Sequence, residues 1–64
     1  MEAQVRRFRV PLSRIAYVRM IVEAYEGLAV MVSARGSTLV EWQVAPGREE
    51  EADSLAESLG LRPG

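Results

Sequence analysis

The sequence lacks cysteine and histidine, and it also contains no lysine and no asparagine. Without cysteine the chain can form neither a disulfide nor a thiolate metal site. Without histidine it lacks the commonest ligand of zinc, copper and iron. The side chains left for a nucleophile or a base are serine, threonine, tyrosine and carboxylates. We therefore expect no metal and no cofactor, and we expect that the protein is not an enzyme.

An excess of charge of one sign and long hydrophobic runs are missing as well. The formal net charge is −1, which argues against a general binder of polyanions such as nucleic acid. No segment reaches the length of a membrane span. The start of the chain has no basic region followed by the apolar stretch of a signal peptide. We expect a cytoplasmic protein with no membrane partner.

The length of 64 residues corresponds to one domain covering residues 1–64. For a chain this short, the gain from apolar burial and the cost of ordering the chain nearly cancel. Such domains usually gain stability from a disulfide, a metal or a partner subunit. Because the composition argues against the first two, the sequence predicts self-association as a homodimer or a larger oligomer.

Three segments have the pattern of strands. In residues 3–10, Phe8 alternates with the arginines around it, as in a half-buried strand. Residues 28–33 are a short apolar run, and residues 38–44 alternate about Trp42. The turn at residues 34–37 joins the last two segments into a β-hairpin.

Two segments have the pattern of helices. Apolar residues recur at helical spacing over residues 12–26, with Ser13 as the expected N-cap and Gly27 closing the helix. Residues 48–59 show the same spacing. Glu49, Glu50 and Glu51 lie in the first turn, where the helix dipole favours negative charge, and Gly60 follows the segment.

The order β-α-β-β-α defines the expected fold class, α+β. It corresponds to a ferredoxin-like pattern without its last strand: an antiparallel three-stranded sheet, order 1-3-2, with two helices on one face. In this arrangement strand 1 lies at an edge with unpaired backbone groups. A second copy of the chain could cover that edge.

Three short motifs occur together in this chain: FRV-P at residues 8–11, EAYEGL at 23–28, and VAPG at 44–47 followed by an acidic helix. In these features the chain resembles a family of short bacterial proteins that is classed only as a domain of unknown function. The resemblance runs from about Phe8 to Leu59. It implies a complete small domain and carries no activity with it.

The expected topology brings EAYEGL and the VAPGR segment to one end of the sheet. The residues that would converge there as a candidate ligand site are Glu23, Tyr25, Glu26, Gly27, Pro46, Gly47 and Arg48. Free N–H groups at the start of the second helix could accept an anion, although the glutamates that follow would repel it. Alternatively, Glu26 pairs with Arg48, Tyr25 belongs to the core and the glycines serve turns only.

Two further patterns have both a functional and a structural interpretation. Glu23 and Glu26 lie three residues apart on a helix and could share acid–base work or hold a hard cation, but such pairs are also common on solvated helices. Arginines surround Phe8, as in RNA-binding sheets. The alternation, however, places Phe8 toward the helices, so we expect no nucleic-acid partner.

The alternation predicts that Trp42 packs with Phe8, Val30 and Leu55 between sheet and helices. On the opposite, open face of the sheet we expect an oligomer contact formed by Val5, Arg7, Arg9, Met31 and Leu39. The leading hypothesis is therefore a homo-oligomeric interaction or regulatory domain. The alternative is a sensor of a small ligand or anion that uses the cleft between EAYEGL and VAPGR.

Overall fold

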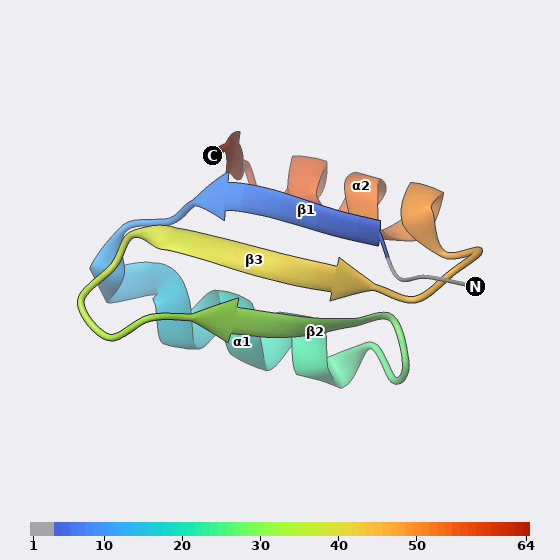
Figure 1. Cartoon of the computed structure of the whole chain (residues 1–64), viewed down its shortest axis with the longest axis horizontal. Helices are drawn as coiled ribbons and strands as arrows, with labels where there is room; N and C mark the ends of the chain where they lie inside the picture. The colour runs from blue at the N-terminus through green and yellow to red at the C-terminus, as the bar shows by residue number, and fades with distance from the viewer. Residues whose placement is uncertain (1–3) are drawn as a thin grey trace.

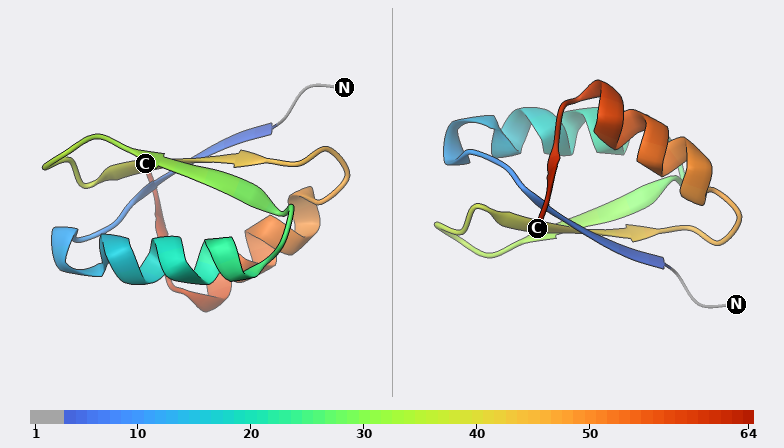
Figure 2. Two further views of the ribbon diagram at one scale, coloured as in Figure 1. Left: turned by 90° about the horizontal axis from the view of Figure 1, so that it is seen from below. Right: turned by 90° about the horizontal axis from the view of Figure 1, so that it is seen from above.

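The computed structural model describes residues 4–64 as one antiparallel sheet with two helices on one of its faces (Figures 1 and 2). The elements in chain order are β1 (Gln4–Arg9), the 3-10 helix η1 (Leu12–Arg14), α1 (Ile15–Ala24), β2 (Ala29–Ser33), β3 (Leu39–Val44), α2 (Glu49–Ser58) and β4 (Arg62–Pro63). The mixed α+β class agrees with the sequence prediction. Residue 3, where the first strand was expected to begin, lies outside the described residues.

Within residues 4–64 the sheet has four strands in the order β2-β3-β1-β4, with every neighbouring pair antiparallel. The prediction of three strands in the order 1-3-2 is corrected accordingly. β3 does lie between β1 and β2, but the chain returns after α2 and adds β4 to the outer edge of β1. Gly60, at φ 70°, allows this sharp return. The Gly64 N–H then donates to the Arg7 carbonyl at 2.9 Å, so that edge is covered in part by the chain itself.

The first helix is shorter than predicted. Pro11 leads into a 3-10 turn, in which the Arg14 N–H donates to the Pro11 carbonyl at 2.8 Å, and the α-helix begins only at Ile15. Ser13 therefore lies inside the 3-10 turn and is not the N-cap of α1. The helix ends at Ala24, and Gly27 takes a φ of 68° in the turn that follows.

A single core lies between the sheet and the two helices. Trp42 is completely buried at its centre and meets Phe8 edge to face, with ring centroids 4.9 Å apart. Leu55 of α2 belongs to the same cluster, so Phe8 and Leu55 both lie in the core with Trp42, as predicted. The other buried members are Val10, Val18, Val22, Leu28, Met31, Val40, Val44, Ala52 and Ala56.

The side chains of β2 that point toward the helices are the opposite set from the predicted one. Met31 pairs with Trp42 in the hairpin register and is buried beside it, whereas Val30 is 62% exposed on the open face. The predicted core position of Val30 and the predicted surface position of Met31 are therefore both wrong. Apolar residues run along both faces of this strand, so its sequence contains no alternation, and only the hairpin register assigns the faces.

Candidate functional site

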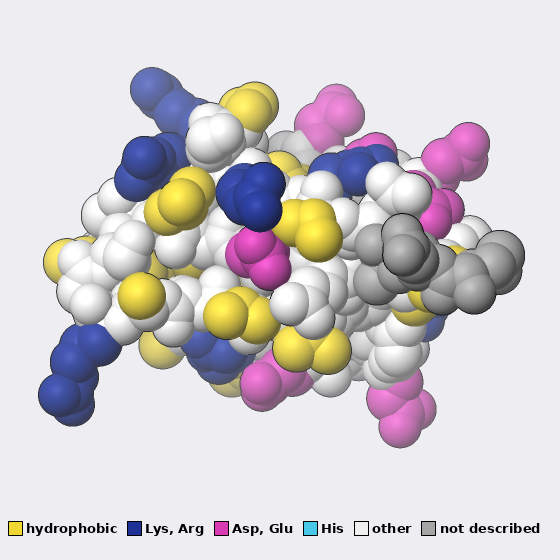
Figure 3. All heavy atoms as spheres, viewed as in Figure 1, with side chains coloured by type: hydrophobic (Ala, Val, Ile, Leu, Met, Phe, Trp, Pro, Cys, Tyr) yellow, Lys and Arg dark blue, Asp and Glu magenta, His cyan; other side chains and the backbone are white. Residues whose placement is uncertain are grey.

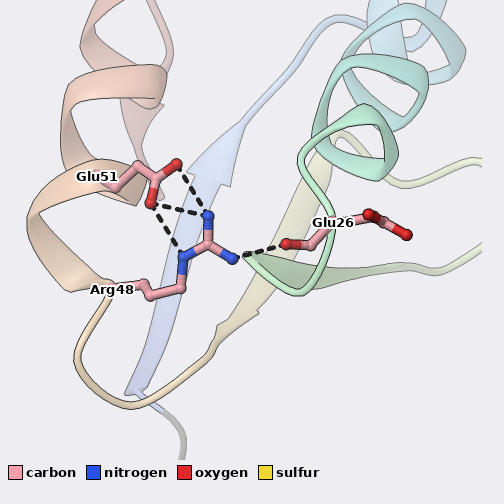
Figure 4. Close-up of polar contacts among 3 residues, drawn as sticks. All are labelled: Glu26, Arg48 and Glu51. Carbon is pink, nitrogen blue, oxygen red and sulfur yellow. Dashed lines mark hydrogen bonds and ion pairs between the residues drawn. The ribbon is translucent and has the colours of Figure 1, made fainter.

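The end of α1 and the start of α2 lie at the same end of the sheet, as predicted (Figure 1). Arg48 joins them: its Nη1 donates to the main-chain carbonyl of Glu26 at 2.6 Å. Its Nε and Nη2 donate to the carboxylate of Glu51 at 3.0 and 2.9 Å. Figure 4 shows the Glu26 carboxylate directed away from the guanidinium group. The proximity of Glu26 and Arg48 is confirmed, but their side chains do not form the ion pair that the alternative interpretation suggested.

This Arg48 clasp ties the turn after α1 to the first turn of α2. Gly27 lies in that turn, and a Cβ added to it would lie 3.5 Å from Arg48 Nη1, an ordinary contact distance. On the other side, the Gly47 N–H donates to both carboxylate oxygens of Glu49 at 3.1 Å. Carboxylates of this chain thus already surround the start of α2, where the sequence suggested room for an anion.

The remaining residues of the predicted site do not converge on Arg48. Glu23, Tyr25 and Pro46 are exposed, and neither Glu23 nor Tyr25 forms a side-chain hydrogen bond within residues 4–64. Tyr25 is 41% exposed, so its alternative assignment to the core is wrong. The structure thus brings Glu26, Gly27 and Arg48 together.

A shallow depression of about 350 Å³ lies next to the clasp. Its lining residues are Gly27, Leu28, Ala29, Val30, Gln43 and Ala45. Gln43 supplies the one polar side chain of this lining. The depression therefore offers an apolar surface with little capacity to bind a charged ligand.

The open face of the sheet carries apolar and charged side chains in rows set by the strand register. Val5, Gln43 and Val30 form one row across the strands, and Arg7, Glu41 and Val32 form the next. Figure 3, which views this face, shows apolar side chains over the strands beside charged ones.

Arg7 and Glu41 are cross-strand partners and form an ion pair of 3.4 Å on this face. Of the five residues predicted as an oligomer contact, Met31 is buried on the other side. Val30 and Val32, which sequence reasoning did not assign there, occupy the face instead. Phe8 is buried against the helices, so its ring is not available for stacking on this face.

Sequence reasoning missed a pocket at the opposite end of the sheet from the clasp. It measures about 440 Å³ and is lined by Arg9, Val10, Pro11, Arg14, Thr38, Gly60, Leu61 and Arg62. The available signal was topological: the end of the first strand, the start of the first helix and the segment after the second helix all reach this end. Each of these segments carries an arginine.

Together these features define a small α+β domain in which two helices cover one face of a four-stranded antiparallel sheet. The chain belongs to the family described as a domain of unknown function (DUF4911), whose model matches residues 8–61. This confirms the resemblance inferred from the sequence. No curated protein and no solved structure matches the chain. Within residues 4–64, the helices are too short and too polar to cross a membrane.

Proposed function

We propose that the protein is a homo-oligomeric interaction domain in which a second copy covers the open face of the sheet. The observation that supports this proposal best is the exposure of three valines on that face: Val5 at 43%, Val30 at 62% and Val32 at 46%. Half-buried Leu39 lies on the same face. A sheet with one solvated face usually carries polar side chains there, so this composition favours a covered surface.

The charges on the face are compatible with such a contact. Arg7 and Glu41 neutralise each other within one copy, and the Arg9 Nη1 donates to the Thr38 hydroxyl at 3.3 Å. Two sheets can then pack face to face, as in β-sandwiches. Completing the burial of a half-exposed valine contributes about 1 kcal/mol. Six such valines in a dimer would therefore add a useful margin to a domain this small.

The alternative, a ligand or anion sensor at the EAYEGL–VAPGR end, has weaker support. The charge of Arg48 is matched by Glu51, and Glu49 accepts the N–H of Gly47. An anion would have to displace carboxylates that belong to the chain. The open face is therefore the better candidate for the functional surface.

Analytical ultracentrifugation of a charged double variant tests the proposal. We expect the wild type to sediment as a dimer or larger species that dissociates on dilution, and Val30→Lys/Val32→Lys to sediment as a monomer. Met20→Lys is the matched control: Met20 is 59% exposed on α1, on the other side of the molecule. Two-dimensional NMR spectra of each variant establish that it is folded.

Two results would contradict this proposal. The first is a wild type that is monomeric at every concentration. The second is dissociation by Met20→Lys with an intact oligomer in the valine variant, which would assign the contact to the outer face of α1. Tyr17 of α1 is also exposed, as is Leu12 in the 3-10 turn before it.

A further inference from the structure

The pocket at the far end of the sheet collects three arginines from distant parts of the sequence. Arg9 ends β1, Arg14 ends the 3-10 turn before α1, and Arg62 begins β4. Figure 3 shows basic side chains gathered over β4 and the end of β1, with acidic ones at the opposite end of the molecule. The folded chain thus has a basic end, although its net charge is only −1.

The charges of these three arginines are not neutralised by the described residues. Arg6, Arg7 and Arg48 each form an ion pair with a carboxylate, whereas the pocket arginines form none within residues 4–64.

Their contacts are with neutral groups instead. The Arg9 Nη1 donates to the Thr38 hydroxyl at 3.3 Å, and the Arg14 guanidinium lies 5.8 Å from the centroid of the Tyr17 ring. Neutral partners of this kind orient a guanidinium group without cancelling its charge.

The helix termini do not change this balance. α1 begins beside the pocket and α2 ends beside it, so the positive end of one helix dipole is opposed by the negative end of the other. The three guanidinium groups therefore determine the sign of the net charge at the pocket, which is positive. Like charges lining one pocket repel each other, and a bound dianion would relieve that repulsion.

We propose that this pocket binds the phosphate group of a small organic phosphate. Guanidinium groups match phosphate oxygens in bidentate geometry. Val10, Pro11 and Leu61 form an apolar wall for the organic part of the ligand. No aromatic side chain is among the lining residues, which disfavours a single-stranded nucleic acid, because such ligands are usually held by base stacking. A pocket of about 440 Å³ is within the range of small-molecule sites.

NMR titration of the 15N-labelled chain tests this assignment with three probes: inorganic phosphate, inorganic pyrophosphate and glycerol 3-phosphate. We expect saturable shifts of the amides of Thr38, Leu61 and Arg62. Glycerol 3-phosphate should bind more tightly than inorganic phosphate, because the apolar wall contacts its organic part. The site is separate from the valines of the open face, so the titration also gives a result if the protein is monomeric.

Arginine variants separate a built site from general attraction to a basic surface. Arg14→Gln and Arg62→Gln should each weaken binding about tenfold or more, the loss typical of a charge-assisted contact. Arg35→Gln is the matched control: this exposed arginine of the β2–β3 loop is outside the pocket and forms no ion pair within residues 4–64. We expect it to change binding by less than about twofold.

Three outcomes would overturn the proposal. They are the absence of saturable shifts with every probe, equal weakening by Arg35→Gln and the pocket variants, and an RNA oligonucleotide that binds and that pyrophosphate cannot displace. The amide spectrum of each variant shows whether it is folded. Because Arg14 and Arg62 lie on different elements, each variant tests the site independently of the other.

Discussion

Replacing Trp42 tests the arrangement of the core most directly. Its side chain is completely buried and packs edge to face on Phe8. Truncating a buried tryptophan to alanine costs about 3–5 kcal/mol. A domain of 64 residues has a total stability of roughly 3–10 kcal/mol at typical values per residue. We therefore expect Trp42→Ala to lower the free energy of unfolding by a third or more and to leave many molecules unfolded.

Trp42→Phe separates the contribution of packing from that of the indole N–H. Nε1 of Trp42 is buried without a hydrogen-bond partner among the described residues. An unpaired buried donor costs about 1–3 kcal/mol. Phenylalanine removes this donor while it keeps an aromatic ring against Phe8. We expect Trp42→Phe to lose less than half of the stability that Trp42→Ala loses.

Urea unfolding followed by far-UV circular dichroism measures both variants, because this signal does not depend on the tryptophan. The wild type provides a control: Trp42 is the one tryptophan of the chain, so its fluorescence should be blue-shifted and should move to the red on unfolding. An unchanged midpoint for Trp42→Ala would refute the core assignment. Equal losses for the two variants would contradict the predicted cost of the unpaired indole N–H.

Two further predictions concern the turns and the clasp. Gly27→Ala and Gly36→Ala should each lower the free energy of unfolding by about 1–2 kcal/mol. Both positions have positive φ, and an added Cβ meets no steric clash at either, so the backbone conformation alone causes the loss. Thermal unfolding measures both variants, and an unchanged melting temperature for either one would contradict this prediction. In double-mutant cycles, Arg48→Gln should couple to Glu51→Gln by about 0–1 kcal/mol, with weaker coupling at high salt, and not to Glu26→Gln, since Arg48 binds only the main chain of Glu26. Coupling to Glu26 instead would show that the carboxylate turns toward Arg48.

The strands that alternate in sequence were predicted with the right faces, and the strand that does not alternate was not. In β3, Trp42 is separated by polar residues from its apolar neighbours, so its direction toward the helices follows from the pattern alone. β2 reads Ala-Val-Met-Val-Ser, and a one-residue shift would exchange Val30 and Met31 without changing its composition. Only pairing with β3 distinguishes the two faces.

The candidate sites depended on contacts that the sequence does not specify. Topology alone brought Glu26 and Arg48 together, but the choice between the carboxylate and the carbonyl of Glu26 depends on the turn around Gly27. β4 has two residues and therefore shows no periodicity at all. The expected topology already brought the end of β1, the start of α1 and the segment after α2 to one end of the sheet, but the position of Arg62 in the pocket depends on the return of the chain after Gly60.

The two edges of the sheet are protected in different ways, and this leads to the last prediction. On the β1 side, β4 covers part of the edge, and Pro63 has no N–H to offer to another strand. On the β2 side, Arg19 reaches over from α1. Its Nη1 donates to the Met31 carbonyl at 2.9 Å, and its Nη2 donates to the Ser33 hydroxyl at 2.6 Å. A charged group at a strand edge hinders pairing with another chain.

Arg19→Met keeps most of the length of the side chain and removes these two hydrogen bonds. We expect it to lower the free energy of unfolding by about 1–3 kcal/mol and to increase concentration-dependent aggregation, because the Met31 carbonyl becomes free to pair. Urea unfolding and light scattering at several protein concentrations measure the two effects. Arg35→Met is the control: it removes the same charge, but Arg35 lies in a turn and covers no strand edge. If both variants aggregate alike, loss of charge is the cause, and Arg19 does not protect the edge of β2.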